Sequence, residues 1–127
     1  MKLSSNALAV GIWSEDYKKL AQWYIDVLGF TIKEQAELPN DSYIAFSLGD
    51  NLLWIGKHDK VSGKNKDPYR IMIEFYVESV MNTYNELKEK TNITFIAEPF
   101  AEPTGTGNWC MTIADPEGNI LQFYGKK

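Results

Sequence analysis

Charged and aromatic side chains occupy alternate positions of the segment 69–77, which has the alternating pattern of a β-strand. Arg70, Glu74 and Tyr76 share one face of that expected strand. A carboxylate can act as a general base and a phenol as a proton donor, so Glu74 and Tyr76 are candidates for proton transfer. Arg70 on the same face opposes a raised pKa at Glu74, and the alternative is that the two charges simply neutralise each other.

A second group of this kind lies near the end of the chain. Asp115 to Gly118 has the residues of a tight turn, with Asp first, Pro second and Gly last. The run 120–124 that follows is β-prone and places Gln122 and Tyr124 on one face. This pattern predicts a strand whose front can bind a ligand and whose back is apolar, with Tyr124 as a second candidate proton donor.

Four Trp and seven Tyr are more than a core of 127 residues needs. Most are expected to pack, but Trp13, Tyr43 and Trp54 are candidates for a pocket wall, because small organic ligands stack on aromatic faces. The single histidine, His58, is expected to be a solvated loop residue. The single cysteine, Cys110, is expected to be buried and inert, because no nucleophile–base pair is readable around it.

Two similar series of elements position these residues. The first series is a strand at 7–13, a helix from an N-cap at Ser14 to Leu28, and strands at 30–33, 43–48 and 52–55. The second series is a strand at 69–77, a helix at 79–90, and strands at 95–97, 109–113 and 120–124. Gly29 is placed to end the first helix in a left-handed conformation. The repeated order predicts an α+β fold with internal symmetry.

Length and composition favour a small globular protein. A chain of 127 residues is expected to form a single domain, 1–127. Its net charge of -4 argues against a nucleic-acid partner and favours cationic ligands. Because no apolar run is long enough to span a membrane and no leader is recognisable, a cytoplasmic protein is expected.

Two motifs resemble those of the vicinal oxygen chelate superfamily, which includes glyoxalase I, bleomycin resistance proteins, fosfomycin resistance enzymes and extradiol dioxygenases. Ser14-Glu-Asp16 followed by Trp23-Tyr24-Ile-Asp-Val-Leu-Gly-Phe30 resembles its N-terminal signature, and Asp115 to Gln122 resembles its closing motif. The resemblance implies two βαβββ modules, each curling an antiparallel sheet around a cleft, and a homodimer. The modules are expected at about 5–58 and 69–126, joined by a linker at about 59–68.

The resemblance also implies where a metal would be held. Metal-dependent members use a His on the first strand, a His or Glu on the strand that opens the second half, and a Glu on the last strand. These positions fall on Ala9, Met72 and Gln122. Ala has no donor atom, the Met thioether is a poor ligand for a hard divalent ion, and the neutral Gln amide is a weak one. We therefore expect no metal and no other cofactor. A register shift of two residues would move these assignments, but His58 is the only histidine available.

Three functions remain open for the expected cleft. The first is a metal-free protein similar to the bleomycin resistance branch, sequestering an aromatic or cationic organic compound, a role related to antibiotic resistance. The second is a lyase, isomerase or dioxygenase-like enzyme with unorthodox or no metal ligands and Glu74 as base. The third is a dimeric scaffold or regulatory partner with a vestigial cleft. The residues expected to contact a small organic molecule are Trp13, Tyr43, Trp54, Arg70, Glu74, Tyr76, Gln122 and Tyr124.

Overall fold

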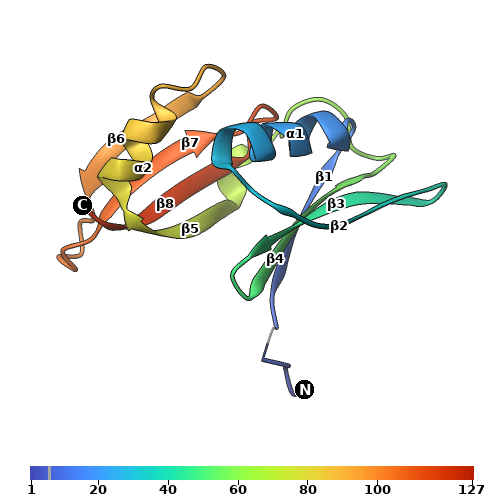
Figure 1. Ribbon diagram of the computed structural model, residues 1–127, viewed down its shortest axis with the longest axis horizontal. Coiled ribbons are helices and arrows are strands. Elements are labelled where there is room, and N and C mark those ends of the chain that lie inside the picture. Colours follow the sequence, from blue (N-terminus) through green and yellow to red (C-terminus); the bar gives the residue numbers. More distant parts are fainter. Residues whose placement is uncertain (6) are drawn as a thin grey trace. The chain divides into compact units, whose positions relative to one another are not determined.

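The computed structural model describes residues 1–5 and 7–127, which form two compact units, 1–63 and 64–127. Each unit consists of one α-helix and one four-stranded sheet (Figure 1). The α+β class is therefore confirmed, and each unit has the β-α-β-β-β order that the sequence predicted. Within the described residues, neither helix combines the length and the apolar character needed to cross a membrane.

The first unit forms a mixed sheet. Its elements are β1 (Ala9–Ser14), α1 (Tyr17–Leu28), β2 (Ile32–Leu38), β3 (Asp41–Leu48) and β4 (Asn51–Lys57). The strands lie in the order β1-β4-β3-β2, with β1 parallel to β4 and the other neighbours antiparallel. A parallel pair needs a long connection, and the chain between β1 and β4 supplies one. The resemblance had implied an antiparallel sheet, but the pair β1–β4 is parallel.

Helix α1 is capped at both ends by the residues around it. The N-cap is Asp16, whose carboxylate accepts a hydrogen bond from the Lys19 backbone nitrogen at 3.3 Å. The expectation that Ser14 caps the helix is wrong, because Ser14 ends β1 and its buried hydroxyl accepts a hydrogen bond from the Asp16 backbone nitrogen at 3.0 Å. Gly29 ends the helix with a left-handed φ of 71° and donates to the Ile25 carbonyl, as predicted.

The helix covers only one face of the first sheet. It contacts β1, β3 and β4, and its buried Leu20 and Tyr24 belong to the same core as Phe46, Leu53 and Ile55. Burying side chains of this size stabilises the fold by about 1.5–3 kcal/mol each. Because successive strand residues point to opposite faces, the residues between these core positions are on the uncovered face.

The second unit repeats the arrangement. Its elements are a 3₁₀ helix η1 (Pro68–Arg70), β5 (Met72–Ser79), α2 (Val80–Leu87), β6 (Thr94–Ala101), β7 (Trp109–Ala114) and β8 (Ile120–Lys126). The strands lie in the order β5-β8-β7-β6, with β5 parallel to β8. Helix α2 is shorter than predicted, and Ser79 caps it by accepting a hydrogen bond from the Asn82 backbone nitrogen at 3.2 Å.

The turn between β7 and β8 is held by a buried carboxylate. The backbone nitrogen of Gly118 donates to the Asp115 carbonyl at 3.0 Å, and Gly118 has a φ of 83°. The Asp115 side chain accepts hydrogen bonds from the backbone nitrogens of Glu117 and Asn119, both at 2.9 Å, and from the Asn119 amide at 2.8 Å. The predicted tight turn is confirmed, and it sets the register of β8.

Candidate ligand-binding site

The uncovered face of the first sheet carries large and small side chains in two adjacent rows. In strand order β1-β4-β3-β2, one row is Gly11, Trp54, Ala45 and Glu34, and the next is Trp13, Gly56, Tyr43 and Ala36. Trp54 and Tyr43 therefore have Gly or Ala on both sides in their rows, and Trp13, on the edge strand β1, has Gly56 as its one neighbour. Trp13 and Tyr43 lie on either side of Gly56, two strand spacings or about 10 Å apart. The small residues leave room above the sheet.

Glycine is needed at two of these positions because indole rings lie across the backbone. A Cβ atom on Gly11 would come within 2.0 Å of Cζ2 of Trp54. A Cβ atom on Gly56 would come within 3.0 Å of Cζ3 of Trp13. The indole rings of Trp54 and Trp13 can pack against the backbone of the sheet only because Gly11 and Gly56 have no side chain.

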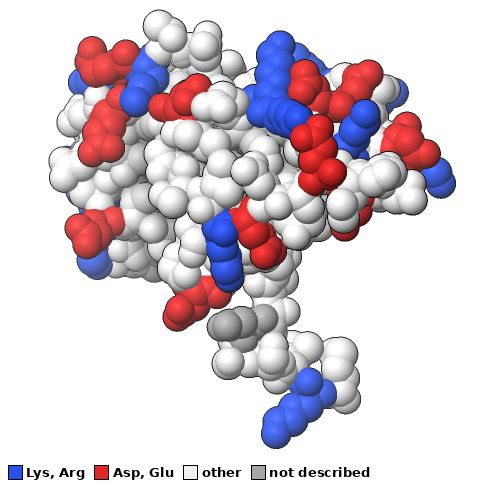
Figure 2. All heavy atoms as spheres, turned by 45° about the vertical axis from the view of Figure 1, so that its right-hand side comes forward, with Lys and Arg blue, Asp and Glu red and all other residues white. Residues whose placement is uncertain are grey.

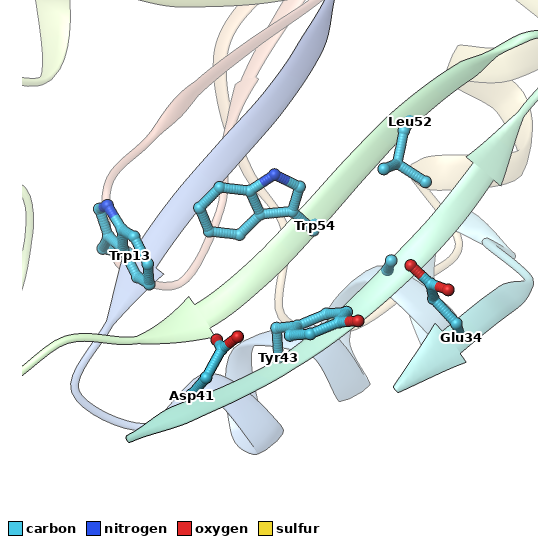
Figure 3. Close-up of a pocket in the computed structure, with 7 residues that line it drawn as sticks. Trp13, Glu34, Asp41, Tyr43, Leu52 and Trp54 are labelled. Atoms are coloured by element: carbon cyan, nitrogen blue, oxygen red, sulfur yellow. The ribbon is translucent and has the colours of Figure 1, made fainter. Parts of the chain in front are cut away.

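These rows enclose a pocket of about 290 Å³. Figure 3 shows Trp13, Trp54 and Tyr43 around the hollow, with Leu52 at one end and two carboxylates on the β2–β3 side. Its lining is Trp13, Glu34, Asp41, Tyr43, Ala45, Leu52 and Trp54. The volume is at the lower end of the range of small-molecule sites, and the combination of aromatic walls with a few polar groups is typical of them.

Aromatic contacts order the β1 side of the pocket. The rings of Trp13 and Trp54 meet edge to face, with centroids 4.8 Å apart and planes at 70°. The His58 ring also contacts the Trp13 ring edge to face, with centroids 5.0 Å apart and planes at 71°. His58 also accepts a hydrogen bond at Nδ1 from the Lys60 backbone nitrogen, so it is not the freely solvated side chain that was expected. Trp13 still exposes 44% of its surface, which leaves it available to a ligand.

The charged residues that line the pocket are both acidic. The carboxylate of Glu34, burial and the carboxylate of Asp41 together raise the pKa of the Tyr43 hydroxyl above its ordinary value of 10.0, with Glu34 the largest cause. In Figure 3 the hydroxyl end of Tyr43 points toward Glu34. Because both carboxylates also line the pocket, they would attract a positive charge placed in it.

Sequence analysis identified the aromatic part of this pocket and missed the rest. Trp13, Tyr43 and Trp54 were expected, and the structure places all three on one face. Glu34 was missed because the second strand was recognised only at its start, residues 30–33, whereas β2 continues to 38. Asp41, which opens β3, was not among the expected residues. Extending the β-pattern through 32–38 could have revealed Glu34.

The expected residues of the second half form a separate group in the second unit. Glu74 lies beside Gln122, and Tyr76 beside Tyr124, in the parallel register of β5 and β8. The rings of Tyr76 and Tyr124 meet edge to face at 5.7 Å. Asn108 donates a hydrogen bond to the Tyr124 hydroxyl at 2.7 Å. These four side chains thus share one face of the second sheet, as their alternation predicted.

Arg70 is not part of this group. It lies in η1, before β5 begins, and its Nε donates to the carboxylate of Asp67 at 2.6 Å. The expected strand 69–77 is therefore too long at its start, and Arg70 is paired with Asp67 and not with Glu74. The local cause is the Asp-Pro step at Asp67, because proline favours the first turn of a helix.

The side chains at the family's metal positions do not fit a metal. Ala9 has no donor atom, and the register of β5 and β8 places Glu74, two residues beyond Met72, next to Gln122. One carboxylate and one neutral amide are a weak set for a divalent ion. Across residues 1–5 and 7–127, no three His, Cys, Asp or Glu side chains are grouped so that they could hold one.

Cys110 is buried, as expected. Burial raises the pKa of its thiol, and the carboxylates of Glu74 and Glu102 raise it further. A thiol with a raised pKa is a poor nucleophile, because the thiolate is the reactive form.

Comparison with known proteins places this fold in a family. Residues 7–123 match the model of the glyoxalase/bleomycin resistance protein/dioxygenase superfamily. The chain therefore belongs to this superfamily. A search of curated proteins finds no match.

Solved structures with the same fold include three named relatives. A glyoxalase family protein from Enterococcus faecalis is 23% identical, with a TM-score of 0.73 over 91% of this chain and 94% of that one. A glyoxylase/bleomycin resistance protein/dioxygenase domain from Frankia sp. EAN1pec is 19% identical, with a TM-score of 0.77 over 100% and 93%. A lactoylglutathione lyase from Agrobacterium tumefaciens is 18% identical, with a TM-score of 0.71 over 98% and 96%. At these identities the likeness concerns the fold.

Proposed function

We propose that this chain binds and sequesters an aromatic or cationic organic compound in the pocket of its first unit, without a metal ion. The observation that carries the proposal is the pocket itself, in which Trp13, Tyr43 and Trp54 form aromatic walls. The side chains around it fit a compound held by its flat or apolar surface. Family membership supports a small-molecule ligand but names none.

The residues at the metal positions support the metal-free part of the proposal. Ala9, Met72 and Gln122 stand where the resemblance places His, His or Glu, and Glu. The nearest carboxylate, Glu74, stands next to an amide rather than a second charged ligand. A protein that uses no metal can lose these ligands without losing its pocket.

The remaining parts of the proposal concern assembly and partners. We propose a cytoplasmic homodimer with no nucleic-acid partner. Tyr69, Ile71 and Tyr76 expose 77%, 72% and 79% of their surfaces, which supports self-association. The face drawn in Figure 2 carries Lys and Arg in groups mixed with Asp and Glu, unlike the single-sign surface of a nucleic-acid-binding protein. Light scattering tests the dimer, and a monomer at every concentration contradicts it.

The experiment for this function is a ligand screen followed by two matched substitutions. Compounds are screened by their effect on Trp fluorescence, after removal of metals with a chelator. Trp13→Ala should abolish binding of any hit, because it removes one wall of the pocket. Phe100→Ala, which removes an exposed aromatic side chain from β6 in the second unit, should leave binding unchanged. Loss of binding in Phe100→Ala alone would contradict the assignment of the pocket.

One observation favours a second function, an enzyme of the same superfamily. Glu74, Tyr76, Gln122 and Tyr124 lie together on one face of the second sheet, and this set contains a base and two proton donors. Under this alternative, Glu74→Gln abolishes turnover of a substrate and leaves the affinity of the first-unit pocket unchanged. Equal turnover by the parent and by Glu74→Gln would remove Glu74 as the base.

A further inference from the structure

We propose that the pocket of the first unit selects N-methylated organic ammonium ions over neutral molecules of the same shape. This inference rests on the proposed binding function and names the chemical class of its ligand. It is supported by the fact that two carboxylates, of Glu34 and Asp41, and two indole rings, of Trp13 and Trp54, line the same pocket.

The charged side chains that line the pocket are all negative. Glu34 and Asp41 are the ionisable acidic side chains of the pocket, and no Lys or Arg is among the residues that line it. Within the described part of the chain, the ion pairs are Lys18–Glu37, His58–Asp59 and Arg70–Asp67, so neither pocket carboxylate has a basic partner. A ligand with a positive charge would provide one, whereas an anion would be repelled.

The aromatic walls favour the same charge. A cation is attracted to the negative face of an aromatic ring, most strongly to Trp. Trp13 and Trp54 meet at 70°, so the two indoles present surfaces in two directions at one corner of the pocket. Tyr43 forms the facing wall across Gly56. An ammonium group between them would contact aromatic surface on more than one side.

Methyl groups on the nitrogen suit this pocket better than N–H groups. A primary ammonium is strongly hydrated and loses that hydration when it enters an aromatic site. A methylated ammonium is less hydrated, and its methyl groups can pack against Leu52 as well as against the rings. Glu34 and Asp41 are exposed, so they attract the charge from the rim without being desolvated themselves.

The behaviour of Tyr43 supports the sign of the field. Its hydroxyl lies near Glu34, whose negative charge is the main cause of its raised pKa, with Asp41 acting in the same direction. A cation bound in the hollow would oppose the effect of both carboxylates. The pKa of Tyr43 should therefore fall when a cationic ligand binds and should not fall when a neutral ligand binds.

The test uses three small probes of similar size: benzyltrimethylammonium, its neutral carbon isostere neopentylbenzene, and benzoate. Binding is followed by NMR through the indole N–H signals of the four tryptophans. Trp13 and Trp54 line the pocket, while Trp23 is buried in α1 and Trp109 lies in β7, so the latter two are internal controls. Signals are assigned from the Trp13→Phe and Trp54→Phe variants.

The expected result is that benzyltrimethylammonium shifts the Trp13 and Trp54 signals and binds at least about tenfold more tightly than the neutral isostere. Glu34→Gln and Asp41→Asn should each lower the affinity for the cation about 3- to 5-fold and leave the affinity for neopentylbenzene unchanged. Lys18 is paired with Glu37 on the exposed surface, so Glu37→Gln is a matched control that should change neither.

The two ways of failing are distinguishable. If the neutral isostere binds as tightly as the cation, the inference about ligand charge is overturned and the proposed binding function stands. If no probe shifts Trp13 or Trp54 at millimolar concentration, the pocket assignment and the proposed function both fail. If affinity for the cation is unchanged in both carboxylate variants, recognition by Glu34 and Asp41 is overturned.

Discussion

The substitution Gly11→Ala tests whether the pocket depends on indole rings lying across the sheet. Gly11 does not itself line the pocket, but a Cβ atom there would lie 2.0 Å from Cζ2 and 2.4 Å from Cε2 of Trp54. The backbone can accept alanine at this position, so the conflict is one of space alone. Trp54 must therefore rotate away from β1, and the pocket loses the wall that Trp54 forms.

The expected cost can be divided between folding and binding. Forcing an extra methyl group into a packed site destabilises a protein by about 1–3 kcal/mol. Loss of one aromatic wall removes about 0.5–2 kcal/mol of attraction for a cationic ligand, which corresponds to about a 2- to 30-fold loss of affinity. Urea denaturation measures the first quantity. Titration with benzyltrimethylammonium, followed by the Trp54 indole signal, measures the second.

Two further variants show that space is the cause. In Gly11→Ala/Trp54→Leu the smaller side chain removes the clash, so the double variant should recover about 0.5–3 kcal/mol relative to the sum of the single changes. Gly63→Ala places a Cβ at a loop position with a φ of 64° and nothing within 4 Å. It should destabilise by about 1–2 kcal/mol through backbone strain and leave binding unchanged. Parent-like stability and an unmoved Trp54 signal in Gly11→Ala would refute the reasoning.

Three other results are expected. Asp115→Ala should lower the free energy of unfolding by about 2–3 kcal/mol in urea denaturation, because it removes the buried carboxylate that accepts the hydrogen bonds of this half-buried turn. A parent-like midpoint would contradict the role of this carboxylate. Tyr43 should keep its proton to a pH above 10.0, and Glu34→Gln should move its titration, followed by NMR of the ring, back toward that value. The folded state binds this proton more tightly than the unfolded state, so the contribution of Tyr43 to stability is lost as the pH rises from 10.0 through the raised pKa. Cys110 should react with a thiol reagent at the rate of global unfolding, because burial protects the sulfur and raises its pKa, and rapid labelling of the native protein would contradict this.

Much of the fold was predictable because local signals agreed with one another. The Gly29 cap and the turn at Asp115 to Gly118 each require a left-handed glycine, and both were assigned from the sequence. Alternation placed Trp13 opposite the buried Ile12. Ser14 misled the helix prediction because serine caps helices often, but here β1 includes Ser14 and the Asp16 carboxylate caps the helix.

The pocket was less predictable, because it depends on strand register. Trp13, Tyr43 and Trp54 could be assigned by residue type, but the rows that surround them with Gly11, Gly56 and Ala45 exist only once β1 pairs with β4. Periodicity gives the face of a residue and not its neighbours on other strands. Arg70 was misplaced for a related reason, since the strand pattern does not mark where the 3₁₀ helix ends.

The most direct test of the account is the indole NMR titration with benzyltrimethylammonium on protein stripped of metal by a chelator, repeated after addition of Zn²⁺, Mg²⁺ and Mn²⁺. We expect saturable shifts of Trp13 and Trp54, unmoved Trp23, and the same affinity with and without each ion. Binding that appears only after a metal ion is added would contradict the central claim that the pocket of the first unit binds its ligand without one.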